Sequence, residues 1–221
     1  MARQPITRER IIEATVRVIH TNGVAGATTR AIVRAVPCAE GTLYLYFKHR
    51  TELILAVIEQ SVGAFVEVLK RLPHHVGRKT VAGNLATIIQ QAAKFQEEAL
   101  TLLCGVVSDP ELLRSQQIVM RQARKGPHLS RLAIANYLEA EKAEGRVSPR
   151  LDSKMVAGLL LRASFGCIFE KRFAGASSGT TDRRQMKTLI VALLANPSGL
   201  VFRPSRGKTT KSLKRARKAR A

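Results

Sequence analysis

The stretch "VPCAEGTLYLYF", residues 36–47, decides how the N-terminal part of this chain is interpreted. Its second half, residues 42–47, is rich in threonine, tyrosine and phenylalanine, residue types that favour a β-strand. The first 70 residues around it show apolar residues at helical spacing instead. We therefore predict that residues 39–47 form a short helix, in which packing and function override the local strand propensity.

The elements on either side of this stretch are predicted to be helices. Residues 7–22 carry apolar residues at helical spacing, with Thr7 as the N-cap and Asn22-Gly23 as a left-handed stop. A short helix is predicted to begin at Thr28 and to end before Pro37, since the residue before a proline avoids the helical region. A long amphipathic helix follows over residues 50–71.

The remainder of the chain also reads as helices separated by proline- and glycine-containing breaks, with no strand pattern. The predicted fold class is all-α, with an N-terminal three-helix helix-turn-helix head, a larger C-terminal helical domain and about nine helices. The C-terminal helices are expected near residues 80–95, 97–107, 110–124, 128–144, 153–173 and 182–195.

The charge of the chain is strongly positive. Lys and Arg number 37 against 16 acidic residues, a net charge of +21. Residues 203–221 hold nine of these basic residues and no acid, and the rest of the chain is basic as well. Such an excess predicts attraction to polyanions, and the tail, which is poor in apolar residues, is expected to be disordered.

The cysteines and the apolar runs indicate the compartment. Cys38, Cys104 and Cys167 lie far apart, so free thiols in a reducing cytoplasm are expected. The most apolar run, residues 155–169, is too short to span a bilayer and carries Arg162, so we expect no membrane partner.

A DNA-recognition helix must pack one face against the helices behind it and present the other face to DNA, and residues 39–47 can do both. Leu43 and Phe47 lie four apart and are predicted to anchor the buried face. Hydroxyl-bearing residues with Leu45 between them are left for the outer face, where they can contact phosphates and base edges. The predicted DNA-contacting residues are Thr28, Thr29, Arg30, Glu40, Gly41, Thr42, Tyr44, Tyr46, Lys48 and Arg50.

The alternative interpretation is that Tyr44 and Tyr46 belong to the core, as aromatic residues at helical spacing usually do. The buried face of this segment is already filled by Leu43 and Phe47, and basic residues flank the segment on both sides. The DNA-facing interpretation is therefore favoured.

With these residues in view, the sequence resembles the TetR family of bacterial transcriptional regulators. The resemblance is carried by "TTRAIVRAVPCAEGTLYLYFKHRTEL" (28–53) and by the preceding "RERIIEATVRVIHTNGVAGA". It is specific over about residues 7–58, and beyond them it concerns only the order and length of the helices.

The resemblance implies a DNA-binding domain over residues 1–49, with its motif at about 28–47, and a helical ligand-binding and dimerisation domain over residues 50–202, followed by the tail 203–221. Members of the family are homodimers that bind palindromic double-stranded operators, usually as repressors. A small-molecule effector binds the C-terminal domain and moves the two heads out of register with the half-sites.

The turn before the recognition helix departs from the family pattern. This chain has Val36-Pro37-Cys38-Ala39 where the family usually has Ala-Gly-Val-Ser. Proline cannot adopt the left-handed conformation of a turn glycine, so the turn is expected to be reshaped or to use negative φ. Ala39 forfeits a side-chain N-cap, at a cost of about 1 kcal/mol. Cys38 in place of a buried valine is a mild change.

The C-terminal helices offer candidate ligand-binding residues, for each of which ordinary core packing is the alternative. They are Phe65, Phe95, Leu103, Cys104, Met120, Tyr137, Arg162 and Phe165. Arg162 is expected to be buried and to need an anionic partner, either a carboxylate across a dimer or an acidic ligand.

A homodimer interface is expected on the last two helices, with a monomeric core as the alternative. Helix 153–173 carries a stripe of Met155, Leu159, Arg162, Gly166, Phe169 and Phe173. It is predicted to pair with the stripe of helix 182–195, formed by Met186, Leu189, Ile190, Leu193 and Leu194.

The competing functions are an enzyme and a non-specific nucleic-acid-binding protein. The five histidines and three cysteines show no metal-ligand spacing, and no phosphate loop or nucleophile motif is present, so no enzyme, metal or cofactor is expected. The alternative function is charge-driven, non-specific nucleic-acid binding through the basic tail.

Overall fold

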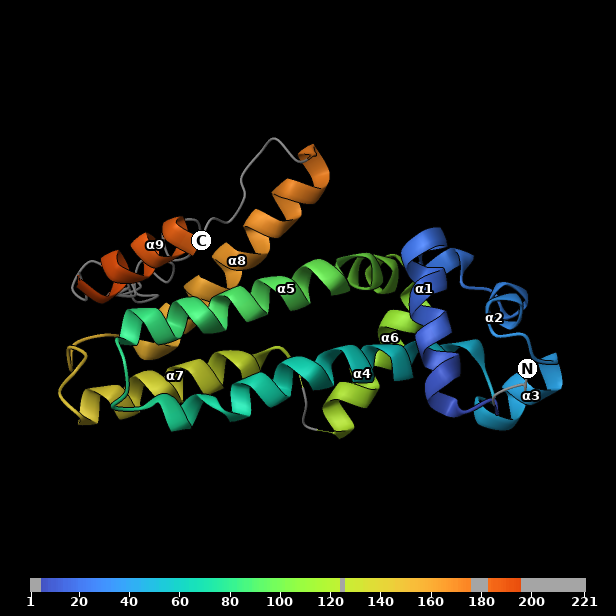
Figure 1. The fold of residues 1–221 in the computed structure, drawn as a ribbon, viewed down its shortest axis with the longest axis horizontal. Helices are drawn as coiled ribbons and strands as arrows, with labels where there is room; N and C mark the ends of the chain where they lie inside the picture. The colour runs from blue at the N-terminus through green and yellow to red at the C-terminus, as the bar shows by residue number, and fades with distance from the viewer. Residues whose placement is uncertain (1–4, 124–125, 176–182, 196–221) are drawn as a thin grey trace, which may run out of the picture.

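The computed structural model describes residues 5–123, 126–175 and 183–195, and within these ranges the chain is helical with no strand (Figure 1). The all-α prediction is confirmed. The predicted tail 203–221 lies outside the described residues. The elements are α1 (Arg8–Gly26), α2 (Thr29–Ala35), α3 (Glu40–Tyr46), α4 (Arg50–Lys70), the 3₁₀-helix η1 (Leu72–His75), α5 (Val81–Ser108), α6 (Pro110–Gln122), α7 (His128–Ala143), α8 (Ser153–Ala174) and α9 (Arg183–Ala195).

Two predicted boundaries differ from the structure. The separate helices predicted at 80–95 and 97–107 form one 28-residue helix, α5. No proline or glycine interrupts residues 95–98, so the hydrogen-bonded backbone continues. The stop at Asn22-Gly23 is only partly correct. Gly23 has the predicted positive φ of 71°, but the chain resumes one more turn and α1 ends at Gly26.

The helices form an elongated molecule with the three N-terminal helices at one end (Figure 1). α4 and α5 run lengthwise and pack on each other, and α7 and α8 pack together alongside them. α9 packs on α5, and α1 contacts both α4 and α5. The head is therefore attached to the rest of the molecule through α4 and α5 together.

The head has a hydrophobic core that includes side chains of the C-terminal helices. Leu43 of α3 and Ile32 of α2 lie in this core, with residues of α1 and α4. Leu102 and Val106 of α5 and Leu112 of α6 are buried in the same cluster. The core is thus continuous from the helix-turn-helix to the middle of the chain.

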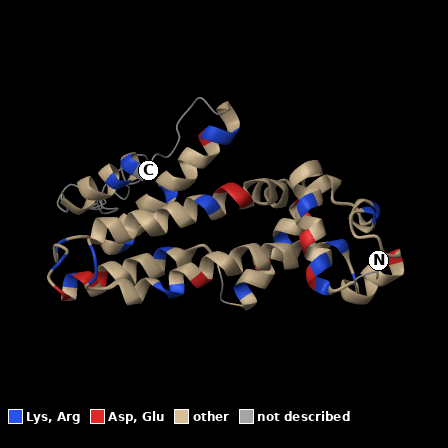
Figure 2. Cartoon of the chain, in the orientation of Figure 1, with Lys and Arg blue, Asp and Glu red and all other residues tan. Residues whose placement is uncertain are grey.

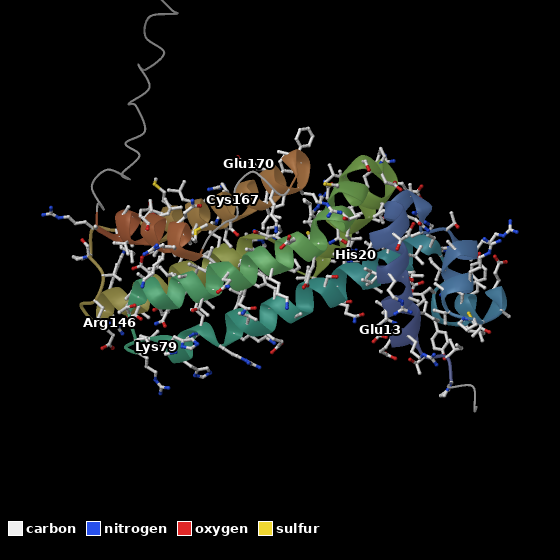
Figure 3. The ribbon with its side chains drawn as sticks, turned by 45° about the horizontal axis from the view of Figure 1, so that its top comes forward. Glu13, His20, Lys79, Arg146, Cys167 and Glu170 are labelled. Carbon is white, nitrogen blue, oxygen red and sulfur yellow. The ribbon has the colours of Figure 1, made fainter. Side chains whose placement is uncertain are left out.

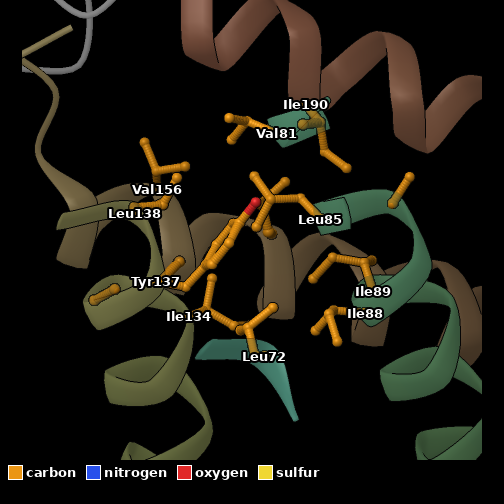
Figure 4. Close-up of a cluster of buried hydrophobic side chains, with 14 of the residues drawn as sticks. Leu72, Val81, Leu85, Ile88, Ile89, Ile134, Tyr137, Leu138, Val156 and Ile190 are labelled. Atoms are coloured by element: carbon orange, nitrogen blue, oxygen red, sulfur yellow. The ribbon is translucent and has the colours of Figure 1, made fainter. Parts of the chain in front are cut away.

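A second core fills the other end of the bundle. It joins α4, η1, α5, α7, α8 and α9 around Tyr137, Leu85 and Ile134 (Figure 4). Phe65 of α4 stacks on Phe95 of α5, with ring centroids 5.2 Å apart and planes within 4° of parallel.

Besides this shared core, the junction between the head and the rest contains one close helix approach and one bridging arginine. A Cβ atom on Gly105 of α5 would overlap Val24 at the end of α1, so the contact requires a glycine. The guanidinium of Arg50, at the start of α4, donates from Nε to the Ala27 carbonyl (2.9 Å) and from Nη2 to the Val24 carbonyl. Arg50 therefore fastens α4 to the end of α1.

A buried polar network closes the opposite end of the molecule, where Lys79 and Arg146 lie together (Figure 3). The Glu141 carboxylate is fully buried, 3.2 Å from Nη1 of Arg146, and accepts from the backbone N–H of Gly77 (3.4 Å). Arg146 Nη2 donates to the Lys79 carbonyl. Nearby, Asn84 Nδ2 donates to the Tyr137 hydroxyl (2.9 Å). Burial and the Glu141 carboxylate raise the pKa of that hydroxyl.

Glu141→Gln tests this network. The substitution removes the charge that compensates Arg146, and breaking a buried pair is costly because it leaves one charge unpaired. We expect the free energy of unfolding, measured by chemical denaturation, to fall by about 2 kcal/mol. This is less than for a fully buried pair, because Arg146 is partly exposed. Glu67→Gln is the matched control, because its pair with Lys70 is exposed and is expected to matter by under about 0.5 kcal/mol. Equal effects of the two variants would contradict the assignment.

Arg50→Lys tests the junction. Lysine is a point donor and cannot bridge two carbonyls as the guanidinium fork does, so one hydrogen bond is lost. We expect the free energy of unfolding to fall by about 1 kcal/mol, measured by chemical denaturation. Arg34→Lys on the exposed end of α2 is the control and is expected to leave stability unchanged. Unchanged stability of Arg50→Lys would show that the carbonyl contacts are dispensable.

Candidate nucleic-acid interface

The turn between α2 and α3 closes with ordinary extended backbone. Val36 has φ −115° and ψ 101°, and Ala39 has φ −75° and ψ 149°. Among the described non-glycine residues only Lys79 has positive φ, so Pro37 and Cys38 also use negative φ, which is one of the two alternatives expected for this turn. Thr28 Oγ1 caps α2 by accepting from the Ala31 N–H (3.2 Å), whereas Ala39 makes no side-chain cap to α3; both predictions are confirmed.

Cys38 occupies the turn as a partly buried hydrophobic residue. It packs against the head core, and burial raises the pKa of its thiol. A shallow, open groove beside it is lined by Ile6, Pro37, Cys38, Ala39 and Thr42. The change from the family's valine is accommodated without opening the core.

α3 has one buried face and one exposed face. Leu43 is 3% exposed and Phe47 is 1% exposed, so the predicted anchors are confirmed. Tyr44 is 50% exposed and Leu45 is 84% exposed, and Thr42 is partly buried. Glu40 and Gly41 are exposed at the start of the helix, and Gly41 has open space around it. The helix therefore presents its predicted outer face to solvent.

The Tyr46 hydroxyl is engaged within the chain. It donates to the Ile6 carbonyl (2.8 Å), 40 residues earlier in sequence, and so holds the N-terminal segment against the end of α3. Beside it, the Arg8 guanidinium lies over the Phe47 ring, 5.1 Å from the centroid. In this arrangement the Tyr46 hydroxyl has already used its single proton and cannot donate to a phosphate. The sequence carried no signal for this contact.

The remaining predicted DNA contacts are distributed around α3. Thr28 and Arg30 at the start of α2 are exposed, and Thr29 is partly buried. The Lys48 side chain is exposed, while its backbone N–H donates to Glu52 Oε2 (2.8 Å) and so closes the start of α4. Arg50 is partly buried and bonded to the Val24 and Ala27 carbonyls described above. Lys and Arg occur on α1, α2 and the α3–α4 connection (Figure 2).

The eight predicted ligand-binding residues do not gather into one site. Phe65, Phe95 and Tyr137 belong to the second core, which also contains the Phe65–Phe95 stack. Leu103 and Cys104 are exposed near the end of α5, and Met120 is partly buried on α6. Phe165 and Arg162 are exposed on α8.

Arg162 is exposed in the single chain, so it is not buried within the chain's own core as expected. It shares the exposed face of α8 with Leu159 and Phe165, which lie three residues away on either side. Within the chain its guanidinium therefore needs no anionic partner, and a carboxylate across a dimer or an acidic ligand stays a prediction for this position.

The exposed face of α8 is apolar along most of its length. Leu159, Phe165, Phe169 and Phe173 are exposed, and the last two stack with centroids 5.8 Å apart. On α9, Leu189 and Val191 are exposed. Met186 and Ile190, which were predicted to face a partner, are instead buried in the second core, because that side of α9 packs on α5.

Two further observations concern other kinds of site. None of the described helices is both long and apolar enough to cross a lipid bilayer. In the part of the chain that the structure describes, no three His, Cys, Asp or Glu side chains are grouped so that they could hold a metal ion.

Comparison with known proteins identifies the head. The model of the family "Bacterial regulatory proteins, tetR family" matches residues 11–57. The chain is 27% identical over 164 residues to the fatty acid metabolism regulator protein of Bacillus subtilis (strain 168), covering 72% of this chain and 78% of that protein.

Solved structures share the fold over most of the chain. A putative TetR-family transcriptional regulator from Mesorhizobium loti matches with a TM-score of 0.69 and 16% identity, covering 85% of this chain and 95% of that one. The transcriptional regulator FadR from Bacillus subtilis, in complex with stearoyl-CoA, matches with a TM-score of 0.61 and 18% identity, covering 87% and 99%. The matched helix-turn-helix, its exposed face and these relatives agree: residues 11–57 match the DNA-binding domain of the TetR family, and the chain is similar in sequence and fold to bacterial transcriptional regulators of that family.

Proposed function

We propose that this protein is a cytoplasmic, ligand-responsive repressor, without catalytic activity, that binds a palindromic operator as a homodimer. The observation that carries the proposal is the two-faced α3, with Leu43 and Phe47 buried behind an exposed row of residues. A helix so anchored can enter the major groove without exposing its own core.

The proposed DNA contacts divide into two groups. Tyr44, Thr42 and Glu40 on α3 face the groove, with Gly41 permitting close approach. Thr29, Arg30 and Lys48 are proposed to contact phosphates of the DNA backbone. Thr28, at the exposed N-terminal end of α2, is proposed to add a further backbone contact. Tyr46 and Arg50 contribute by fixing the position of α3 and α4, through their bonds to Ile6, Val24 and Ala27, and their remaining surface can touch the backbone.

Dimerisation is proposed to occur through α8 and α9. The apolar face of α8, with Phe165, Phe169 and Phe173, is exposed in the single chain, and contiguous apolar surface of this kind marks interaction sites. Pairing this face with its symmetry copy makes an isologous interface, which a palindromic operator matches.

The effector is proposed to act through the helices of residues 50–202, with residues 1–49 as the DNA-binding domain. The supporting feature is the junction at Gly105, where α5 touches Val24 of α1 without an intervening side chain. A ligand that shifts α5 would displace the end of α1 directly. FadR from Bacillus subtilis was solved with stearoyl-CoA, so this compound is the first probe to use.

Competition binding tests the DNA-binding proposal. A site selected from random DNA should survive an excess of bulk DNA at physiological salt, and Tyr44→Ala should weaken that site about tenfold or more by removing base and phosphate contacts. Electrophoretic mobility shift or fluorescence anisotropy measures both values. Removal of residues 204–221 should lower affinity for all sequences and give a shallower salt dependence.

The charge-driven alternative gives the opposite pattern. If truncation after residue 203 abolished all binding and Tyr44→Ala changed nothing, the tail would be the nucleic-acid-binding element. A DNA length series read by sedimentation would then show loading in proportion to length, without a defined dimer on one site.

Gly105→Ala tests the junction. The added methyl group overlaps Val24, so α1 must move relative to α5. We expect DNA affinity to fall about five- to tenfold, within the usual range for coupling between sites, while stearoyl-CoA or any other effector that binds the wild type binds the variant unchanged. Isothermal titration and anisotropy separate the two effects.

Gly63→Ala is the matched control for this experiment. Gly63 lies on the exposed side of α4 with no atom within 4 Å of a Cβ position, so the substitution should leave DNA affinity unchanged. If both variants, or neither, altered DNA affinity, the Gly105–Val24 contact would not be the route from α5 to the head.

A further inference from the structure

One side chain on α3 has no role in the fold. Leu45 is 84% exposed, although it lies between Tyr44 and Tyr46 on a helix whose other aliphatic residue, Leu43, is buried. Within the described residues, Phe173 alone among the large hydrophobic residues is as exposed. Exposure of an apolar leucine side chain to water is unfavourable. Its position at the centre of the outer face therefore indicates an apolar contact that forms when α3 is covered by a partner.

The geometry of α3 makes Leu45 its most outward side chain. Successive residues of an α-helix are rotated by about 100°, so a residue two positions from both Leu43 and Phe47 points roughly opposite to the buried face. Tyr44 and Tyr46 flank that direction on either side. Gly41, one turn earlier on the same face, leaves open space in front of the helix.

The neighbours of Leu45 increase its importance. The Tyr46 hydroxyl donates to the Ile6 carbonyl, which directs that side chain toward the N-terminal segment. The foremost group that α3 offers to a groove is therefore aliphatic. It neither donates nor accepts a hydrogen bond, and the apolar feature of the major groove is the 5-methyl group of thymine.

We infer that Leu45 is a specificity-determining residue that packs against a thymine 5-methyl group at one base pair of each half-site. The inference rests on the proposed DNA-binding function and deepens it. It assigns the reading of a methyl group to Leu45, and leaves hydrogen-bonded readout to Thr42, Tyr44 and Glu40.

Replacement of thymine by uracil tests this directly, since it removes the methyl group and keeps every hydrogen-bonding group of the base. The full-length chain is titrated with its selected operator, in which each thymine in turn is replaced by uracil in both half-sites. At one symmetric position we expect affinity to fall about fourfold per methyl group, or roughly fifteenfold for the pair. In Leu45→Ala the same replacement should have no effect, and the variant should bind the thymine operator about as weakly as the wild type binds the uracil operator.

Controls separate this role from others. Leu45→Ala should unfold at the wild-type temperature, because an exposed side chain contributes little to the core. Tyr44→Phe should keep the sensitivity to uracil. The inference is overturned if no thymine shows a methyl effect, or if the effect persists in Leu45→Ala. If the wild type selects no site at all, the proposed function itself fails, and that outcome is recognised before any uracil is introduced.

Discussion

The burial of Leu43 and Phe47 behind α3 is the constraint on which the rest of this structure depends. These two side chains commit a seven-residue helix, too short to be stable alone, to one orientation against α1, α2 and α4. Once that orientation is fixed, every other side chain of α3 is placed by helical geometry. The outer face of α3 is thus a consequence of how its inner face packs.

The same reasoning explains a helix written in strand-type residues. Thr42, Tyr44 and Tyr46 lower the intrinsic helix propensity of α3, and Ala39 gives it no side-chain cap. The burial of Leu43 and Phe47, together with the function of the outer face, outweighs the low helix propensity and the missing cap. Tertiary contacts provide the stability that the local sequence lacks, and one of them is the hydrogen bond from Tyr46 to Ile6 at the C-terminal end of the helix.

Much of the head could be predicted from sequence because its signals are local. The spacing of Leu43 and Phe47, the Thr28 cap and the effect of Pro37 each involve residues within a few positions of one another. The contacts of Tyr46 and Arg50 could not be predicted, since their acceptors lie 40 and more than 20 residues away and are backbone carbonyls, which any residue carries. The misplaced Arg162 has another cause. An apolar stripe shows that a helix has an apolar face, but it does not show whether that face is covered within the chain.

The continuity of the head core has a consequence for how regulators of this kind can be recombined. Leu102, Val106 and Leu112 complete a core whose other members lie in the first 58 residues. A fragment cut at the end of the recognition motif would expose that apolar surface to water and lose its packing. A head grafted onto another regulator's body would meet side chains shaped for a different partner. Chimaeras that join where α4 begins therefore need the matching surface of α5 and α6 transferred with the head, because the boundary visible along the chain is not a boundary in the packing.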